Sequence, residues 1–387
     1  MKKKICSIMT RAISVKTFMT ENMIYLSEHG YDSHIICPHS DIFTLTDHKN
    51  IVFHDIEMAR GNVSPFEVVK RVWQMYRIFK KEKFDMICYA SSNASLYASI
   101  AGLLARVPVR VYMQWGIGYD ADYKGIKRSF YKFMELFTCR LSTVVQPDSN
   151  ANLIFSIDEG LYSKKKGEVI YNGSATGVDL NRFDKNKKQL WRNEIRAEFN
   201  IPNDAFVFGF IGRLVPQKGI DELIDSYLKL KKQNVYLMLV GHKDELENLE
   251  QVNLEQAIED DHVIFTGSVL DPERYHAAFD VFVLPSYREG FGMVILEAAA
   301  MEIPSIVTNI KGPTDFVKDD YNGFVCEVMS KESLLKTMKK VMELPIDQFH
   351  KISRTAYDVA KSDFDAEEFK KRLLENRNKL LKHINKE

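Results

Sequence analysis

The feature of this sequence that most restricts its fold is a series of short, almost uninterrupted apolar runs in its second half. They are FVFGFIG (206–212), VYLMLVG (235–241), HVIFTG (262–267), VFVLP (281–285) and PSIVT (304–308). Apolar runs without polar alternation are typical of strands buried on both faces, as the strands of parallel sheets are. Longer segments separate the runs, so this half of the chain predicts β-α-β units and a doubly wound sheet.

The first half shows the same alternation with less regular runs. KICSIM (4–9), HIICP (34–38), FDMICYA (84–90), VRVYMQ (109–114) and STVVQP (142–147) are short and apolar. Residues 63–81 between two of them have helical periodicity. Because 387 residues exceed the usual size of one hydrophobic core, we expect an α/β protein with two doubly wound, Rossmann-like domains.

A polar stretch at 184–204 marks the expected junction between the two domains. We therefore predict a first domain over residues 1–185 and a second over residues 190–364. The charged segment 365–387 predicts a terminal helix, which is either frayed or an arm that packs back on the first domain.

Cysteine usage and hydropathy limit the setting in which this chain works. The five cysteines are scattered and include no CxxC pair, which argues against a disulfide framework or a zinc site. Reduced thiols are typical of cytoplasmic proteins. No run approaches the roughly 20 apolar residues of a membrane-spanning helix, and the N-terminal KKKICSIM is interpreted as a first buried strand. We expect a cytoplasmic protein.

Charge is distributed unevenly along a chain whose formal net charge is zero. Residues 1–190 contain 27 Lys and Arg against 19 Asp and Glu, and the rest of the chain has the opposite surplus. Two segments of the basic half, 68–84 and 124–140, mix basic with apolar and aromatic residues. Either they contact an anionic membrane surface, or their apolar residues face the core. No nucleic-acid recognition motif accompanies them, so we expect no nucleic-acid partner.

Two basic residues follow the first strand of the second series. The strand ends at Gly212, and Arg213 and Lys218 lie in the loop before the next helix. Open α/β sheets bind ligands at the carboxyl ends of their strands. Two cations near a helix N-terminus suit a diphosphate, although the same pair could only cap the loop and contact surface acids.

The most informative stretch is EGFGMVILE, from Glu289 to Glu297. Gly290 and Gly292 allow backbone N–H groups to approach a ligand closely. Apolar residues on both sides of Glu297 predict a mostly buried helix, in which a carboxylate needs a partner. A ribose diol would be one such partner, whereas a solvated Glu297 would need none.

The loops of the first domain are less specific. Arg11 and Lys16 follow the first strand, without the Gly-rich fingerprint of dinucleotide-binding domains. Gln114 and Trp115 open the loop QWGIGYDADYKG (114–125), whose composition is typical of a loop over a substrate. We predict that these four residues contribute to an acceptor or sugar loop.

Several of these segments together resemble a known enzyme family. GRLVPQKGID, LPSYREGFGMVILEAAAMEIPSIVTN and YNGSATGVDLNRF are similar to the signatures of retaining family 4 glycosyltransferases with the GT-B fold, in which two domains face each other across a cleft. The run from QWGIGY to YNGSATGVD more loosely resembles the bacterial O-antigen and capsule subgroup. In this family the final helix crosses back onto the first domain.

The resemblance assigns roles to the residues that match its motifs. It implies that Arg213 and Lys218 hold the donor diphosphate, that Glu297 bonds the ribose and that Glu289 contacts the transferred sugar. Backbone amides near that sugar or its phosphates would come from Gly290, Phe291 and Gly292, next to the strand end at Gly212. Many relatives carry a Gly-rich loop after the first strand and a His after the fourth, where this chain has TRAISVK and Gln114-Trp115.

The expected function is metal-independent transfer, with retention, of a hexose or N-acetylhexosamine from a UDP-sugar. The expected acceptor is a lipid-linked oligosaccharide of cell-surface polysaccharide biosynthesis. No cofactor or metal is expected, and the enzyme would lie on the inner face of the cytoplasmic membrane. The alternatives are a sugar-nucleotide epimerase of the same fold and a non-catalytic sugar-nucleotide-binding subunit. A nicotinamide oxidoreductase is disfavoured because GxGxxG is missing.

Overall fold

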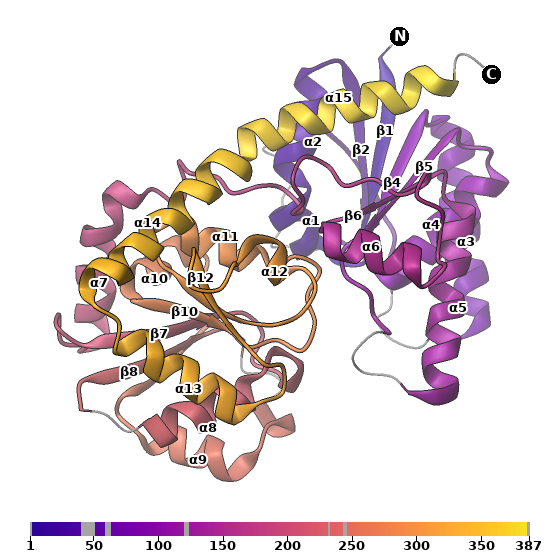
Figure 1. Ribbon diagram of the computed structural model, residues 1–387. Coiled ribbons are helices and arrows are strands. Elements are labelled where there is room, and N and C mark those ends of the chain that lie inside the picture. Colours follow the sequence, from indigo (N-terminus) through magenta and orange to yellow (C-terminus); the bar gives the residue numbers. More distant parts are fainter. Residues whose placement is uncertain are drawn as a thin grey trace. The chain divides into compact units, whose positions relative to one another are not determined.

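Figure 1 shows the computed structural model of the chain. It describes residues 2–39, 51–58, 63–119, 124–230, 233–242 and 246–384. The chain divides into two compact units: unit 1 contains residues 1–176 and 367–387, and unit 2 contains residues 177–366. Each unit is built on a six-stranded parallel sheet with helices on its faces. The prediction of two doubly wound α/β domains is therefore confirmed.

The sheet of unit 1 has the strand order β3-β2-β1-β4-β5-β6. All neighbouring strands pair in parallel, for example with Ser7 of β1 between Ile35 and Cys88. The strands are β1 Lys3–Ile8, β2 Tyr31–Cys37, β3 Ile51–Asp55, β4 Met86–Tyr89, β5 Val109–Gln114 and β6 Val144–Pro147.

Helices cover both faces of this sheet. Alternate residues of β1 enter different cores, because Ile5 packs with α1, α2 and α15 whereas Cys6 packs with α3, α4 and α5. Helix α3 begins where the Ser64 hydroxyl accepts a hydrogen bond from the Glu67 amide. The helices are α1 Ala12–Phe18, α2 Thr20–Glu28, α3 Pro65–Glu82, α4 Ser92–Leu104, α5 Gly125–Leu141, α6 Asn150–Asp158 and α15 Ala366–Ile384.

Helix α15 packs against unit 1 although it comes from the far end of the chain (Figure 1). Phe369, Leu373 and Leu381 join the core on the α2 face of the sheet. The Tyr31 hydroxyl of β2 donates a hydrogen bond to Asn378 Oδ1 at 2.9 Å. The apolar face of α15 thus completes the core of the first unit.

The sheet of unit 2 has the strand order β12-β11-β10-β7-β8-β9 and is also parallel throughout. Its inner strands are buried throughout except at the two ends of β7, which explains why the sequence shows them as continuous apolar runs. The strands are β7 Phe206–Ile211, β8 Val235–Val240, β9 Val263–Gly267, β10 Val281–Leu284, β11 Ser305–Thr308 and β12 Gly323–Cys326.

The polar stretch at 184–204 does not join the units but lies within unit 2. Most of it forms α7, in which Ile195 is buried in the core of unit 2 and Trp191 packs against that core. The division falls at Thr176–Gly177, because Val178 already pairs with Asp365 of the same unit. The helices of unit 2 are α7 Lys188–Glu198, α8 Ile220–Leu230, α9 Gln251–Glu259, α10 Pro272–Ala278, α11 Met293–Ala300, α12 Pro313–Phe316, α13 Lys331–Met342 and α14 Ile346–Asp363.

Candidate functional site

The candidate site lies at one edge of the sheet of unit 2. Winding reverses between β7 and β10, which are the first and fourth strands of the unit but are neighbours in the sheet. Open α/β sheets bind ligands beside the carboxyl ends of the strands at this reversal. The loop after β7 carries Arg213 and Lys218, and the loop after β10 carries Glu289. The fold therefore places both predicted segments at the position where such sheets hold ligands.

The loop after β7 is fixed against the loop after β10. Pro216–Lys218 form a short 3-10 turn, and Gly219 follows with a φ of 71° before α8 begins. A Cβ atom on Gly219 would lie 2.1 Å from the carbonyl oxygen of Pro285. The amide of Tyr287 donates a hydrogen bond to the Gln217 carbonyl at 3.0 Å. Lys218 is thus held beside the second loop by close backbone packing.

The carboxylate of Glu289 is the centre of a polar cluster. Its Oε1 atom forms an ion pair with Lys218 Nζ and accepts a hydrogen bond from Ser286 Oγ at 2.7 Å. Ser286 is fully buried, and its carbonyl accepts a hydrogen bond from the Thr308 hydroxyl of β11. Strand ends of β7, β10 and β11 therefore contribute to one cluster that presents a lysine and a carboxylate.

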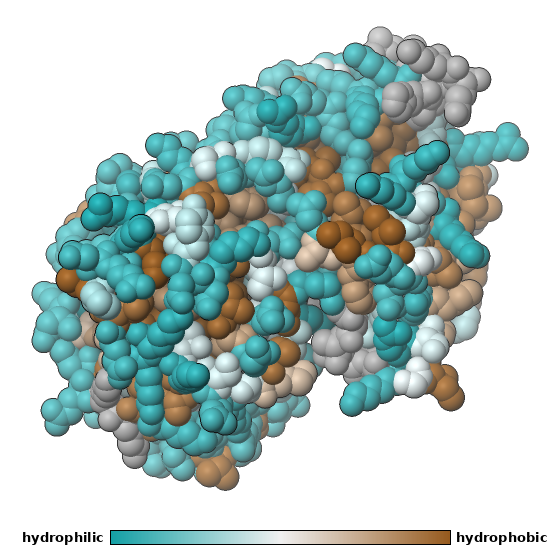
Figure 2. Space-filling view, viewed as in Figure 1, coloured by the Kyte–Doolittle hydropathy of each residue, from teal (hydrophilic) through white to brown (hydrophobic). Residues whose placement is uncertain are grey.

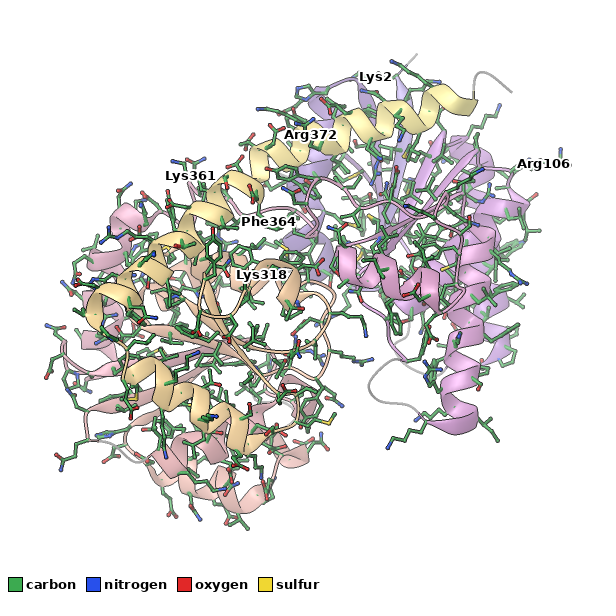
Figure 3. All side chains as sticks on the ribbon, in the orientation of Figure 1. Lys2, Arg106, Lys318, Lys361, Phe364 and Arg372 are labelled. Carbon is green, nitrogen blue, oxygen red and sulfur yellow. The ribbon has the colours of Figure 1, made fainter. Side chains whose placement is uncertain are left out.

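Helix α11 begins directly after this cluster. Gly292 is its N-cap, with a φ of 88° that L side chains rarely adopt. The ring of Phe291 is buried against Phe364, 5.3 Å between centroids, and Phe364 follows α14 in Figure 3. The buried ring anchors the loop, so Phe291 has only its backbone to offer to a ligand. The amide groups at the start of α11 form a suitable anion site.

Glu297, on α11, is not a solvated residue, because its side chain is mostly buried. Its Oε2 atom lies 3.5 Å from Nε2 of His276, which is on α10 and has no exposed surface. His276 was not among the predicted residues, since a single histidine in a helical pattern carries no signal of a partner. The structure brings together Lys218 with Glu289 and Glu297 with His276.

The first-domain residues lie at the carboxyl edge of the other sheet. Arg11 is the N-cap of α1 and Lys16 lies in its last turn, and both are exposed. Trp115 follows β5, is half-buried, and contacts Phe18 edge to face at 5.7 Å between centroids. Residues 120–123 of the loop after Trp115 lie outside the described residues. A role for Arg11, Lys16 and Trp115 in acceptor binding remains a prediction.

Gln114 has a structural role instead of the predicted one. It has no exposed surface, and its Oε1 atom accepts hydrogen bonds from Ser156 Oγ and Tyr162 Oη, both at 3.0 Å. Its Nε2 atom donates to the carboxyl group of Glu135 on α5. Both ends of the amide are occupied inside unit 1, so the assignment of Gln114 to a sugar loop is corrected.

The partner of Gln114 gives a prediction for pH dependence. Burial raises the pKa of Glu135 above its usual value, while hydrogen bonds from Gln114 and Tyr112 act in the opposite direction. A carboxyl group with a raised folded-state pKa contributes stability below its ordinary pKa, and loses that contribution as the pH rises through the raised value. Because Glu135→Gln is neutral throughout, its free energy of unfolding relative to wild type is expected to increase as the pH rises above about 4.

Urea unfolding at several pH values measures this difference. The amide replacement also changes the hydrogen bonding with Tyr112 and Gln114, which shifts the free energy of unfolding by a constant amount. The test is therefore how the difference between variant and wild type changes with pH. The exposed Glu375→Gln, on α15, is the control for replacing a surface carboxylate with an amide. A constant difference between Glu135→Gln and wild type across these pH values would contradict the assignment.

Two family models of glycosyl transferases match this chain. Residues 192–359 match the family model of glycosyl transferases group 1, and residues 4–148 match that of glycosyl transferase 4-like domains. The capsular polysaccharide biosynthesis glycosyltransferase CapM of Staphylococcus aureus is 29% identical over 88% of both chains. A galactosyltransferase of Escherichia coli is 28% identical over 82% of both chains.

Solved structures show the same fold. A glycosyltransferase of Rickettsia africae superposes with a TM-score of 0.80 at 20% identity, covering 98% of this chain and 99% of its own. The Anabaena protein HepE, in complex with UDP and glucose, superposes with a TM-score of 0.79 at 21% identity. The match covers 97% of this chain and all of the HepE chain. The chain thus belongs to the GT-B glycosyltransferases that combine a glycosyl transferase 4-like domain with a group 1 domain.

Proposed function

We propose that the chain is a retaining, metal-independent hexosyltransferase. Its donor is a UDP-sugar carrying a hexose or N-acetylhexosamine, and its acceptor is a lipid-linked oligosaccharide of cell-surface polysaccharide biosynthesis. The observation that carries the proposal is the contact of Lys218 with Glu289 at the reversal between β7 and β10. The cluster offers a cation for a diphosphate and a carboxylate for sugar hydroxyl groups.

The relatives support the choice of substrates. The Escherichia coli relative is named as a transferase from UDP-Gal to GlcNAc-diphosphoundecaprenol. A Campylobacter jejuni relative, 26% identical over 74% of this chain, is named for a diphospho-undecaprenol acceptor. Both names combine a sugar transfer with a lipid diphosphate, and we extend that class of acceptor to this chain.

In the proposed reaction, the bond between the anomeric carbon and the donor phosphate breaks while the acceptor oxygen forms a new bond on the same face. The proton of the acceptor hydroxyl passes to the departing phosphate oxygen. Arg213, Lys218 and the amides at the start of α11 offset the charge that grows on the leaving UDP. Glu289 orients the sugar, and Glu297, held beside His276, bonds the ribose. No metal is needed in this scheme, because protein cations fill that role.

A thermal-shift screen tests the donor assignment. A ligand that binds only the folded state at about 100 times its Kd adds about 2.7 kcal/mol of stability. UDP-sugars are expected to raise the melting temperature more than GDP- or ADP-sugars do. Larger shifts with GDP- or ADP-sugars would contradict the choice of nucleotide, and the absence of any shift would contradict the donor site.

We also propose that the protein lies on the cytoplasmic face of the membrane through residues 68–84 and 124–140. Among the described helices, none is long and apolar enough to cross a bilayer. Helices α3 and α5, with α4 between them, expose large apolar side chains, of which Phe66 is 75% and Ile126 is 91% exposed. This exposure disfavours the alternative in which the apolar residues of these segments all face the core. Other exposed apolar side chains on α3 and α5 are those of Val69, Trp73, Phe130 and Phe133.

Liposome flotation is expected to show binding to vesicles that contain anionic lipid, and weaker binding at high salt. Replacing both Ile126 and Phe130 with serine is expected to reduce the bound fraction, because each side chain loses apolar area that would enter the interface. The exposed Leu270→Ser in unit 2 is the matched control. No flotation with anionic vesicles at low salt would contradict the proposal.

A further inference from the structure

A pocket inside unit 1 is lined by none of the residues proposed to bind the donor. It lies between the sheet, α2 and α15, and holds about 570 Å³ of empty space, part of it open to solvent. Its wall is mostly apolar, with Met19, Met23 and Leu26 on one side and Phe369 and Leu373 of α15 on the other. Methionine side chains adapt to ligands of different shape.

A buried arginine lines this apolar pocket. Arg377 of α15 is 3% exposed. Its Nη1 atom donates hydrogen bonds to Gln146 Oε1 at 2.8 Å and Asn376 Oδ1 at 2.7 Å, and its Nε atom has no hydrogen-bond partner. Within the described part of the chain, Arg377 forms no ion pair. A buried charge without a counterion is costly, so the arginine is suited to an anion from outside the chain.

The neighbouring carboxylates do not supply this counterion. Glu168 accepts hydrogen bonds from Gln146 Nε2 at 3.1 Å and Asn376 Nδ2 at 2.7 Å, and lies 3.7 Å from Lys379. Asp148 lines the same pocket in the loop after β6. The anionic group of a ligand would therefore be directed to Arg377 and away from Asp148.

The two faces of α15 differ in the side chains that they present. Hydrophilic side chains cover the side of α15 seen in Figure 2, and the labelled Arg372 in Figure 3 projects from it. Arg372 is half-exposed and pairs with Glu368 at 2.9 Å. Arg377, on the same helix, lies instead at the pocket. The helix thus offers an arginine with a counterion on its surface and one without a counterion inside.

We propose that this pocket binds a small amphipathic anion, whose carboxylate or phosphate pairs with Arg377 while its apolar chain packs against the methionines and α15. Such a ligand is either a free alkyl carboxylate or the phosphate end of a lipid. The half-buried side chains of Trp115 and Phe18 also line the pocket and suit contact with an apolar chain. The proposal does not depend on the sugar-transfer assignment.

Isothermal titration of the full-length protein with octanoate, octanol and octyltrimethylammonium tests the charge requirement without any mutation. Octanoate is expected to bind saturably and at least about tenfold more tightly than the other two. Farnesyl diphosphate is titrated in a second experiment. Tighter binding than that of octanoate indicates that the natural ligand is a lipid phosphate, and weaker binding indicates a free carboxylate. Equal affinity for the three octyl ligands, or no saturable binding of either anion, would overturn the proposal.

Variants then locate the site. Arg377→Gln is expected to remove the preference for octanoate over octanol, whereas the matched Arg372→Gln on the exposed face of α15 is expected to keep it. Leu373→Phe, which fills part of the pocket, is expected to weaken both octyl ligands. A preference for octanoate that survives in folded Arg377→Gln would overturn the assignment. UDP binding, measured in the same samples, is expected to be unchanged and reports separately on the donor site of unit 2.

Discussion

Replacing Lys218 with methionine is expected to lower the turnover of sugar transfer by about 100- to 1,000-fold, the usual effect of removing one group that stabilises charge in a transition state. The reason is that the ammonium group, held at the strand edge by Glu289, is the cation assigned to the leaving diphosphate. Methionine keeps the length of the apolar stem and removes the charge. Because the effect concerns the transition state, it is expected to persist at saturating donor.

The matched control for this variant is Lys229→Met. Lys229 lies on α8 in the same unit and also forms an ion pair, with Asp225 at 2.8 Å, but its side chain is exposed. Exposed pairs contribute about 0–1 kcal/mol, so this variant is expected to keep normal turnover. Full activity of Lys218→Met at saturating donor would show that the diphosphate is neutralised elsewhere.

Replacing Gly219 with alanine is expected to destabilise unit 2 by about 3 kcal/mol and to weaken UDP binding. Two effects combine: the left-handed conformation at a φ of 71° disfavours a side chain, and the new Cβ would meet the Pro285 carbonyl oxygen at 2.1 Å. Backbone atoms cannot yield as a flexible side chain does. The loops that carry Lys218 and Glu289 must therefore separate.

Gly267→Ala separates the two effects. Gly267 ends β9 with a φ of 79°, close to that of Gly219, but a Cβ there would meet no atom within 4 Å. It carries the conformational cost alone, about 1 kcal/mol. Thermal or urea unfolding together with UDP titration gives both quantities. Equal losses of stability in the two variants would contradict the close contact between the β7 and β10 loops.

The inner strands of both sheets could be predicted because burial on both faces leaves continuous apolar runs in the sequence. Of the four edge strands, β6 and β9 were predicted, whereas β3 and β12 were missed. β3 is only partly buried, with Val52 exposed. A partly exposed edge strand such as β3 needs less apolar sequence than an inner one, so its pattern resembles that of a loop.

Residues of the candidate site could be proposed from the sequence, but their contacts could not. Lys218 and Glu289 are 71 positions apart, and only the strand order of the sheet brings them together. Gln114 shows the opposite case, since its difference from the family pattern suggested a substrate contact. Its partners Ser156 and Tyr162 belong to later segments of the chain, and their packing against β5 decides that it is buried.

The most direct test of the account is the structure of the reaction product. The purified protein is incubated with the UDP-α-sugar that gives the largest thermal shift and with a short-chain lipid diphosphate saccharide. The anomeric configuration of the product is then read by proton NMR. Retaining, metal-independent transfer predicts an α-linked sugar, formed only when the acceptor is present and without added metal. A β-linked product, or conversion of the donor without any acceptor, would contradict it.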